Sequence, residues 1–295
     1  MLTCAILLAA CLANQGKIEP AHAQNAAYNQ VLNQGLEAGG QIIRLPEPRL
    51  VDGQDGSTQR AALREVAGSD RALDDLLRNS ITAPYIIKVH DLKAPGVTIR
   101  AADIWFVVHA DLKQIDFAQE AARADQKEVE VANMWFQTRL LKAADLRAAG
   151  LEPAAPVPGQ SSLYSHVHAR LLDRIDFEVA NHVVASQSAE SVVIASRTDP
   201  SFAKAGPIAN GWKPLAPAGA PKTETPAQPY AGGISYAKIS RVALGPGALL
   251  VEMHVAFIEP EGWFQGAPIL RSKFSIVAQD QIRRLRRELA RKKGK

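Results

Sequence analysis

The segment from Val97 to Leu112 constrains the fold more than any other part of the sequence. Its side chains alternate as those of a strand do, and from Trp105 to Val108 both alternating faces are apolar. A strand that is apolar on both faces has to be covered on both sides. The sequence therefore predicts a sheet with other elements packed against each of its two faces.

Further alternating segments are joined by turn residues. The predicted strands and hairpins cover residues 84–92, 97–112, 127–141, 175–196, 234–242 and 248–259. Ala94-Pro95-Gly96 and Gly245-Pro246-Gly247 mark two of the turns between them. Because strands joined by short turns run antiparallel, we expect an α+β fold with a curved, mostly antiparallel sheet.

Helical patterns are short except at the C-terminus. Helices are predicted over residues 57–67, 70–78, 115–124 and 143–149, and between 163 and 175, where apolar residues recur every fourth position. The longest predicted helix, 272–292, has an apolar stripe with a spacing of four, three and four residues: Ala278, Ile282, Leu285 and Leu289. This stripe predicts that the last helix packs across the sheet.

Three parts of the chain are expected to have different roles. Residues 1–23 contain an apolar run followed by Ala21-His22-Ala23, which predicts an export signal that is removed after Ala23. In the alternative, Leu8-Ala9-Ala10-Cys11 is a lipoprotein signal, and the protein is anchored at Cys11. Residues 24–80 form an extended or helical lead-in, and residues 81–295 form the antiparallel α+β domain, with a proline-rich loop at 213–230. Either signal predicts a periplasmic or extracellular protein.

The cysteines restrict the available chemistry. Cys4 and Cys11 are the two cysteines of the chain, so no disulfide, thiol nucleophile or cysteine-ligated zinc is expected after residue 11. The glycine patterns of dinucleotide-binding and phosphate-binding loops are absent from the sequence. We therefore predict no cofactor.

Positive charge is concentrated in the segment Arg283–Lys295. This segment has eight Arg or Lys residues and one Glu, a net charge of +7, against +4 for the whole chain. It is either a solvated helix end or a tail that contacts an anionic membrane surface. No specific nucleic acid is expected as a partner, because nucleic-acid-binding domains carry their basic residues across a folded face.

Two groups of polar residues are candidates for chemistry. His166 and His168, with Glu178 and His182 downstream, could bind a metal ion if the two histidines lay on a strand, but the local pattern predicts a helix, on which the two imidazoles diverge. The first two predicted strands carry His90, Asp91, Asp103, His109 and Asp111. A His–Asp pair across this hairpin could activate a serine, as in a hydrolase, but no G-x-S-x-G turn presents that serine. Both hypotheses are minor ones.

Adjacent aromatic residues suggest either a core or a ligand cavity. Trp105-Phe106 and Trp135-Phe136 lie on predicted strands, where neighbouring side chains point to opposite faces, and Trp263-Phe264 follows the last strand. These rings either pack on both faces of the sheet or line an apolar cavity. The residues expected to bind a ligand are the three tryptophans together with two residues of the last helix: Trp105, Trp135, Trp263, Ile282 and Leu285.

Residues 173–292 resemble the end of a known family. The last strand, Val251-Glu-Met-His-Val-Ala-Phe-Ile-Glu-Pro, runs into Glu-Gly-Trp263, and a terminal helix with Ile282-Arg-Arg-Leu-Arg-Arg-Glu-Leu289 follows. This order resembles START-like (helix-grip) lipid-binding domains. The resemblance implies a tunnel between the sheet and the last helix that holds a sterol, a lipid or another apolar molecule, and it implies no catalytic residue.

The function predicted from the sequence is an exported, non-enzymatic protein that binds an apolar small molecule or lipid. The alternative is a structural or interaction protein of the cell envelope without a small ligand. A hydrolase or a metal-dependent enzyme is a lesser alternative. The sequence does not predict the oligomeric state.

Overall fold

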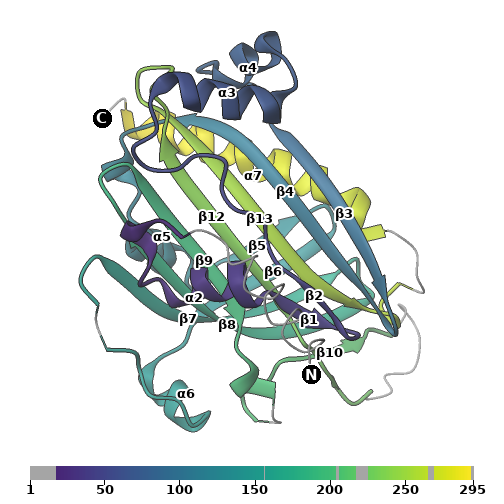
Figure 1. The fold of residues 1–295 in the computed structure, drawn as a ribbon. Helices are drawn as coiled ribbons and strands as arrows, with labels where there is room; N and C mark the ends of the chain where they lie inside the picture. The colour runs from purple at the N-terminus through teal and green to yellow at the C-terminus, as the bar shows by residue number, and fades with distance from the viewer. Residues whose placement is uncertain (1–17, 156, 204–205, 217–224, 265–268, 294–295) are drawn as a thin grey trace, which may run out of the picture.

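The protein folds around one large antiparallel sheet (Figure 1). The computed structural model describes residues 18–155, 157–203, 206–216, 225–264 and 269–293. Residues 1–17 of the predicted signal, with Cys4 and Cys11, and residues 217–224 of the proline-rich loop therefore lie outside the described residues. The predicted α+β class is confirmed, since a curved, open antiparallel sheet is combined with a C-terminal helix.

The sheet has eleven strands, nine of which form a continuous row. In order across the sheet they are β3 (Ile86–Ala94), β4 (Val97–His109), β13 (Ala248–Pro260), β12 (Gly233–Arg241), β9 (Ser191–Thr198), β8 (Ile175–Gln187), β7 (Gln160–Leu171), β6 (Met134–Leu140) and β5 (Glu128–Val131). The short strand β10 (Gly211–Pro214) pairs with β8 and with β11 (Gln228–Pro229). The predicted hairpins around Gly96 and Gly247 are therefore confirmed.

Helix α7 (Ile269–Lys293) covers one face of the sheet, which we call the inner face. Its residues Ala278, Ile282 and Leu289 are buried against Phe106 and Val251. The predicted apolar stripe is thus the packing surface of this helix.

The N-terminal part of the chain covers the opposite, outer face (Figure 1). Tyr28 packs edge-on against Tyr236 of β12, and the helices α3 and α4 pack against Trp105. Trp105 and the adjacent Phe106 are 3% and 2% exposed, so the prediction that this strand is covered on both sides is confirmed. The covering elements are η1 (Pro20–His22), α2 (Ala26–Asn29), η2 (Gln30–Gln34), β1 (Leu36–Ala38), β2 (Gln41–Ile43), α3 (Gly56–Ala67) and α4 (Asp70–Leu77).

Local signals set the ends of these helices. The Ser69 side chain accepts a hydrogen bond from the backbone of Ala72 and caps α4, and Gly68 ends α3 in the left-handed region. Asp55 caps the start of α3. The remaining helical elements are η3 (Leu112–Gln114), α5 (Phe117–Ala124), α6 (Ala143–Ala148) and η4 (Pro200–Ala203). Over the described residues, no helix has the length and apolar character needed to cross a lipid bilayer.

Two predicted elements differ from the structure. The helix predicted between residues 163 and 175 is wrong, because most of this segment is strand β7. A spacing of four is also a multiple of two, so Leu163, Val167 and Leu171 share one face of a strand as well. The strand predicted over 127–141 is a hairpin, whose turn residues Ala132 and Asn133 have φ angles of 53° and 62°.

Candidate ligand cavity

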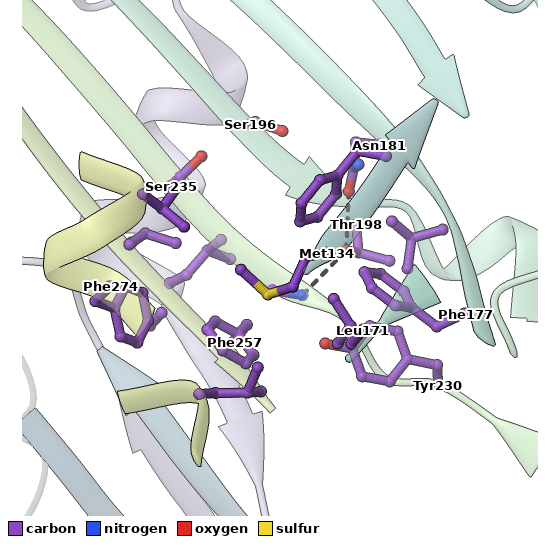
Figure 2. Close-up of a pocket in the computed structure, with 18 of the residues that line it drawn as sticks. Met134, Leu171, Phe177, Asn181, Ser196, Thr198, Tyr230, Ser235, Phe257 and Phe274 are labelled. Atoms are coloured by element: carbon purple, nitrogen blue, oxygen red, sulfur yellow. Dashed lines mark hydrogen bonds between the residues drawn. The ribbon is translucent and has the colours of Figure 1, made fainter. Parts of the chain in front are cut away.

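A cavity of about 330 Å³ lies between the inner face of the sheet and the first half of α7 (Figure 2). Its lining comes from β6, β7, β8, β9, β12 and β13 and from the α7 residues Leu270, Lys273, Phe274 and Val277. These helix residues are spaced by three, one and three positions, so they form one helical face. The sheet bends around this face, because strands as far apart in the row as β6 and β13 contribute to the same cavity.

Aromatic rings form one wall of the cavity. Tyr230 stacks on Trp263 with ring centroids 5.4 Å apart and an interplanar angle of 22°, and Phe177 lies 5.6 Å from both rings. Burial raises the pKa of the Tyr230 phenol far above its ordinary value, so this ring stays uncharged. Because three packed rings restrict one another's rotation, this wall is rigid.

Polar side chains form the other side. Figure 2 places Asn181, Ser196 and Ser235 across from Phe257 and Tyr230. The Thr198 hydroxyl donates a hydrogen bond of 2.9 Å to the Asn181 carbonyl oxygen and accepts one of 3.0 Å from the backbone of Gly233. The Asn181 amide nitrogen has no hydrogen-bond partner in the part of the chain that the structure describes, so it is available to a ligand.

One cation lines the cavity. Among its described lining residues, Lys273 is the one charged side chain, and no described carboxylate lies within ion-pair distance of its ammonium group. An unpaired cation beside an apolar cavity attracts an anionic group. The cavity therefore combines apolar walls with polar and positively charged positions.

Apolar side chains of the inner face extend beyond the cavity. Val255 of β13 lines the cavity, and Met253, two residues away on the same face, has 39% of its surface exposed. Ile194, on the inner face of β9, is half-buried. Helix α7 contacts mainly β4 and β3, so it leaves part of this inner face open to solvent.

The ligand-binding residues predicted from the sequence are separated in the structure. Trp263 lines the cavity. Trp105 and Trp135 lie on the outer face, where the Trp105 indole donates a hydrogen bond of 2.8 Å to Glu252. Ile282 and Leu285 pack against the sheet in the core beside the cavity.

Sequence reasoning missed most of the lining residues, among them four phenylalanines. Phe136 and Phe177 lie on the inner faces of β6 and β8, and Phe274 is on α7. Alternation along the strand already indicated that Phe136 and Trp135 point to opposite faces. Nothing in the sequence indicates which of these two faces is the inner one.

Of the histidines and aspartates on the first two strands, His90 and Asp103 pair across the hairpin, and a second histidine joins them. Asp103 accepts hydrogen bonds from His90 (2.8 Å) and from the buried His254 (2.6 Å), and His254 also contacts Glu252 (3.0 Å). Burial disfavours the charged form of His254, but the two carboxylates outweigh it and raise its pKa. Among the described residues neither ring contacts a serine hydroxyl, so this group lacks the nucleophile that a hydrolase of this kind needs.

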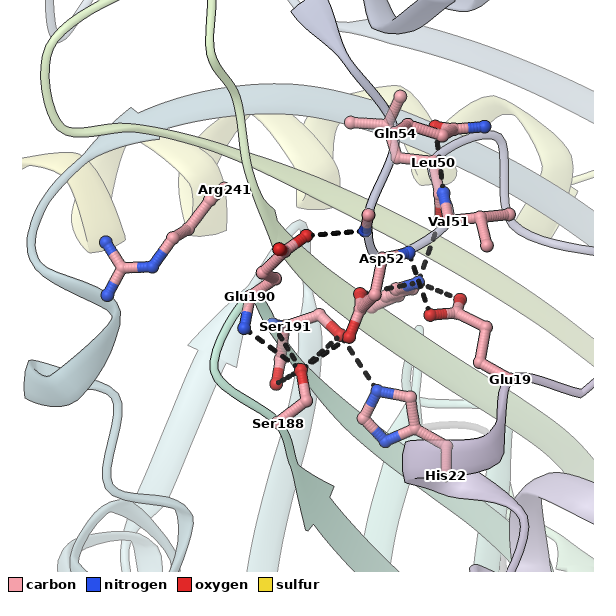
Figure 3. Close-up of polar contacts among 12 residues, drawn as sticks. Glu19, His22, Leu50, Val51, Asp52, Gln54, Ser188, Glu190, Ser191 and Arg241 are labelled. Atoms are coloured by element: carbon pink, nitrogen blue, oxygen red, sulfur yellow. Dashed lines mark hydrogen bonds and ion pairs between the residues drawn. The ribbon is translucent and has the colours of Figure 1, made fainter.

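A second group of polar side chains, around His22, forms hydrogen bonds between the N-terminal segment and the outer face of the sheet (Figure 3). The ring of His22 is hydrogen-bonded to the hydroxyls of Ser186 (2.9 Å) and Ser191 (2.8 Å). His22 has no exposed surface, and burial lowers its pKa to about 4. A substrate cannot reach these serines while His22 is enclosed, so their role is structural.

Lys238 extends this polar group. It is 1% exposed and pairs with Glu19, and its ammonium lies 3.4 Å from Asp52 and 2.9 Å from the Leu50 carbonyl oxygen. Both carboxylates come from the N-terminal segment, whereas Lys238 lies on β12. The segment therefore neutralises a charge that is buried in the sheet.

The basic segment Arg283–Lys295 is only partly a tail. Arg286 is buried, and its guanidinium donates hydrogen bonds to the carbonyl oxygens of Val107 (3.0 Å) and Pro84 (3.2 Å). Burial lowers its pKa to about 10, so it remains charged at neutral pH. Arg283 and Arg287 are exposed. A contact of the exposed arginines with an anionic surface stays a prediction.

The fold and the cavity together define an open antiparallel α+β protein whose C-terminal helix and bent sheet enclose an apolar space. No protein-family model matches the chain, and a search of curated proteins finds no related sequence.

Proposed function

We propose that this is an exported binding protein that holds an apolar or amphipathic small molecule between its sheet and α7. The cavity of about 330 Å³ is the observation that carries this proposal. Ligand sites usually have volumes of roughly 300–1,000 Å³ and are mostly apolar with a few polar groups. An apolar cavity of about 150 Å³ is already large enough to bind benzene. The present cavity therefore suits a two-ring compound or an acyl chain of medium length.

The position of the cavity also supports this function. The resemblance to START-like domains implies a ligand tunnel between the sheet and the last helix, and the cavity has this location. The apolar walls provide the affinity for a hydrocarbon portion, since each buried CH₂ group contributes about 0.8 kcal/mol. Asn181 and Lys273 can orient a polar or acidic end group.

A pair of variants on α7 tests the proposal. Val277 lines the cavity, whereas its neighbour Ile276 is 51% exposed. Val277→Trp should fill the cavity, and Ile276→Trp should add the same ring on the solvent side. Binding of a fluorescent fatty acid, measured by titration, is expected to be lost in Val277→Trp and retained in Ile276→Trp.

Circular dichroism has to show that both variants are folded, because overpacking alone costs about 1–3 kcal/mol. Native mass spectrometry of the unmodified protein provides a second measurement, in which a bound lipid appears as an added mass. The proposal is refuted if the unmodified protein binds no apolar probe, or if both tryptophan variants bind equally well.

A further inference from the structure

Two imidazoles and two carboxylates converge on the outer face of β7 and β8: His166, His168, Asp176 and Glu178. Since this part of the chain is a strand, His166 and His168 project from the same face. Asp176 and Glu178 are likewise two residues apart on β8, and the register places His168 directly opposite Glu178. The topology thus brings together side chains that a helix would have separated.

The donor atoms are close to one another. His166 Nε2 lies 3.2 Å from a Glu178 oxygen, and His168 Nε2 lies 3.0 Å from an Asp176 oxygen. One donor atom from each of His168, Asp176 and Glu178 lies within 4.8 Å of the other two. Ligand atoms around a tetrahedral zinc ion are roughly 3.4 Å apart, given metal–ligand distances of about 2.1 Å. Small rotations would bring these three donor atoms to such separations, and His166, whose ring lies beside Glu178, can supply a fourth donor.

A cleft borders the two carboxylates. It has a volume of about 210 Å³ and is lined by Asp176, Glu178, Gly211 and Lys213, among others. A metal ion held by the four side chains would have water or a small ligand on this side. The side chains of His166 and Asp176 are each 13% exposed, whereas those of His168 and Glu178 are 25% and 42% exposed, so an ion could reach the cluster from solvent.

Neighbouring cations limit which metals fit. Lys213 lies opposite Asp176 in the β8–β10 register. The Arg170 guanidinium lies 3.8 Å from the Asp176 carboxylate and also over the Trp135 ring. These two positive charges offset the two carboxylates. Ca²⁺ and Mg²⁺ depend on negatively charged oxygen ligands, whereas Zn²⁺, Ni²⁺ and Cu²⁺ gain from imidazole nitrogens.

We propose that His166, His168, Asp176 and Glu178 bind one divalent transition-metal ion, represented by Zn²⁺. In the other convergent group among the described residues, Glu19, His22 and Asp52, both ring nitrogens of the buried His22 are already hydrogen-bonded to serines. The proposal does not depend on the ligand cavity, because the cluster lies on the opposite face of the sheet.

Calorimetric titration of the untagged, EDTA-treated full chain with ZnCl₂ tests this site. We expect one Zn²⁺ per chain, a higher thermal unfolding midpoint with Zn²⁺, and no comparable response to CaCl₂. His168→Ala and Glu178→Gln should each weaken binding at least about tenfold, the range known for residues that support a metal site.

His182→Ala is the matched control. His182 lies on β8 four residues from Glu178, and its ring contacts Ser162 and stacks on Tyr164 rather than on a carboxylate. This variant should bind Zn²⁺ as the unmodified chain does. The site is disproved if the unmodified chain does not bind Zn²⁺, or if His168→Ala and His182→Ala have equal affinities.

Discussion

Replacing Glu19 with alanine should destabilise the fold by about 3 kcal/mol. Breaking a buried ion pair by removing one partner costs about 3–5 kcal/mol, because the other charge stays buried without compensation. Lys238 is 1% exposed, so its ammonium cannot regain water in the folded state. Asp52 remains 3.4 Å from the ammonium, which places the expected loss at the lower end of that range.

Urea unfolding followed by circular dichroism measures this loss as a lower transition midpoint with an unchanged slope. Glu65→Ala is the control, because the Arg49–Glu65 pair is exposed and such pairs contribute about 0–1 kcal/mol. The double variant Glu19→Leu/Lys238→Met should be more stable than Glu19→Ala, since it leaves no buried charge unpaired. The reasoning fails if Glu19→Ala and Glu65→Ala unfold at the same urea concentration.

The contacts of Glu19 and His22 also affect how stable the chain is after removal of an N-terminal signal. A cut after Ala23 would remove both Glu19 and His22, and with them one partner each of Lys238, Ser186 and Ser191. A chain that starts at Gln24 should therefore be less stable than one that starts at Ile18, by at least the loss caused by Glu19→Ala. The intact mass of an exported form shows where the cut is made. Equal stability of the two chains would contradict this account.

Four further outcomes are expected. Arg286→Lys should lower stability by about 1–3 kcal/mol in urea unfolding, because an ammonium group cannot bond the same carbonyl oxygens as the guanidinium fork. Gly232→Ala should cost at least about 2 kcal/mol, since Gly232 has a φ angle of 85° and a Cβ there would lie 2.2 Å from the Thr198 side chain. His22 has a pKa of about 4 in the fold against about 6.5 when unfolded, so the unfolded chain binds more protons between these values. Stability should therefore fall by up to about 3 kcal/mol as the pH drops from 6.5 to 4, and His22→Asn should lose most of this pH dependence. Lys273→Gln should weaken binding of a fatty acid more than binding of the corresponding alcohol, measured by displacement of a fluorescent probe.

The strands and the last helix could be predicted because their patterns are local. Alternation around Trp105 showed that the strand is covered on both faces, and the apolar stripe through Ile282 showed which side of α7 packs. Capping by Ser69 and the end of α3 at Gly68 depend on neighbouring residues alone. Only β7 was misread as a helix, because a four-residue spacing satisfies both periods.

The cavity and the arrangement of the proposed metal site could not be predicted in this way. Alternation shows that Trp135 and Phe136 point apart, but which of them meets α7 depends on how the sheet bends. His168 and Glu178 become neighbours through the β7–β8 register, and Glu19 meets Lys238 across more than two hundred positions of sequence. The sequence by itself therefore determined the elements and their apolar faces, because these follow from contacts between residues close in the chain. The tertiary structure decided which faces enclose a space and which charges meet, because both depend on the curvature and pairing of distant strands.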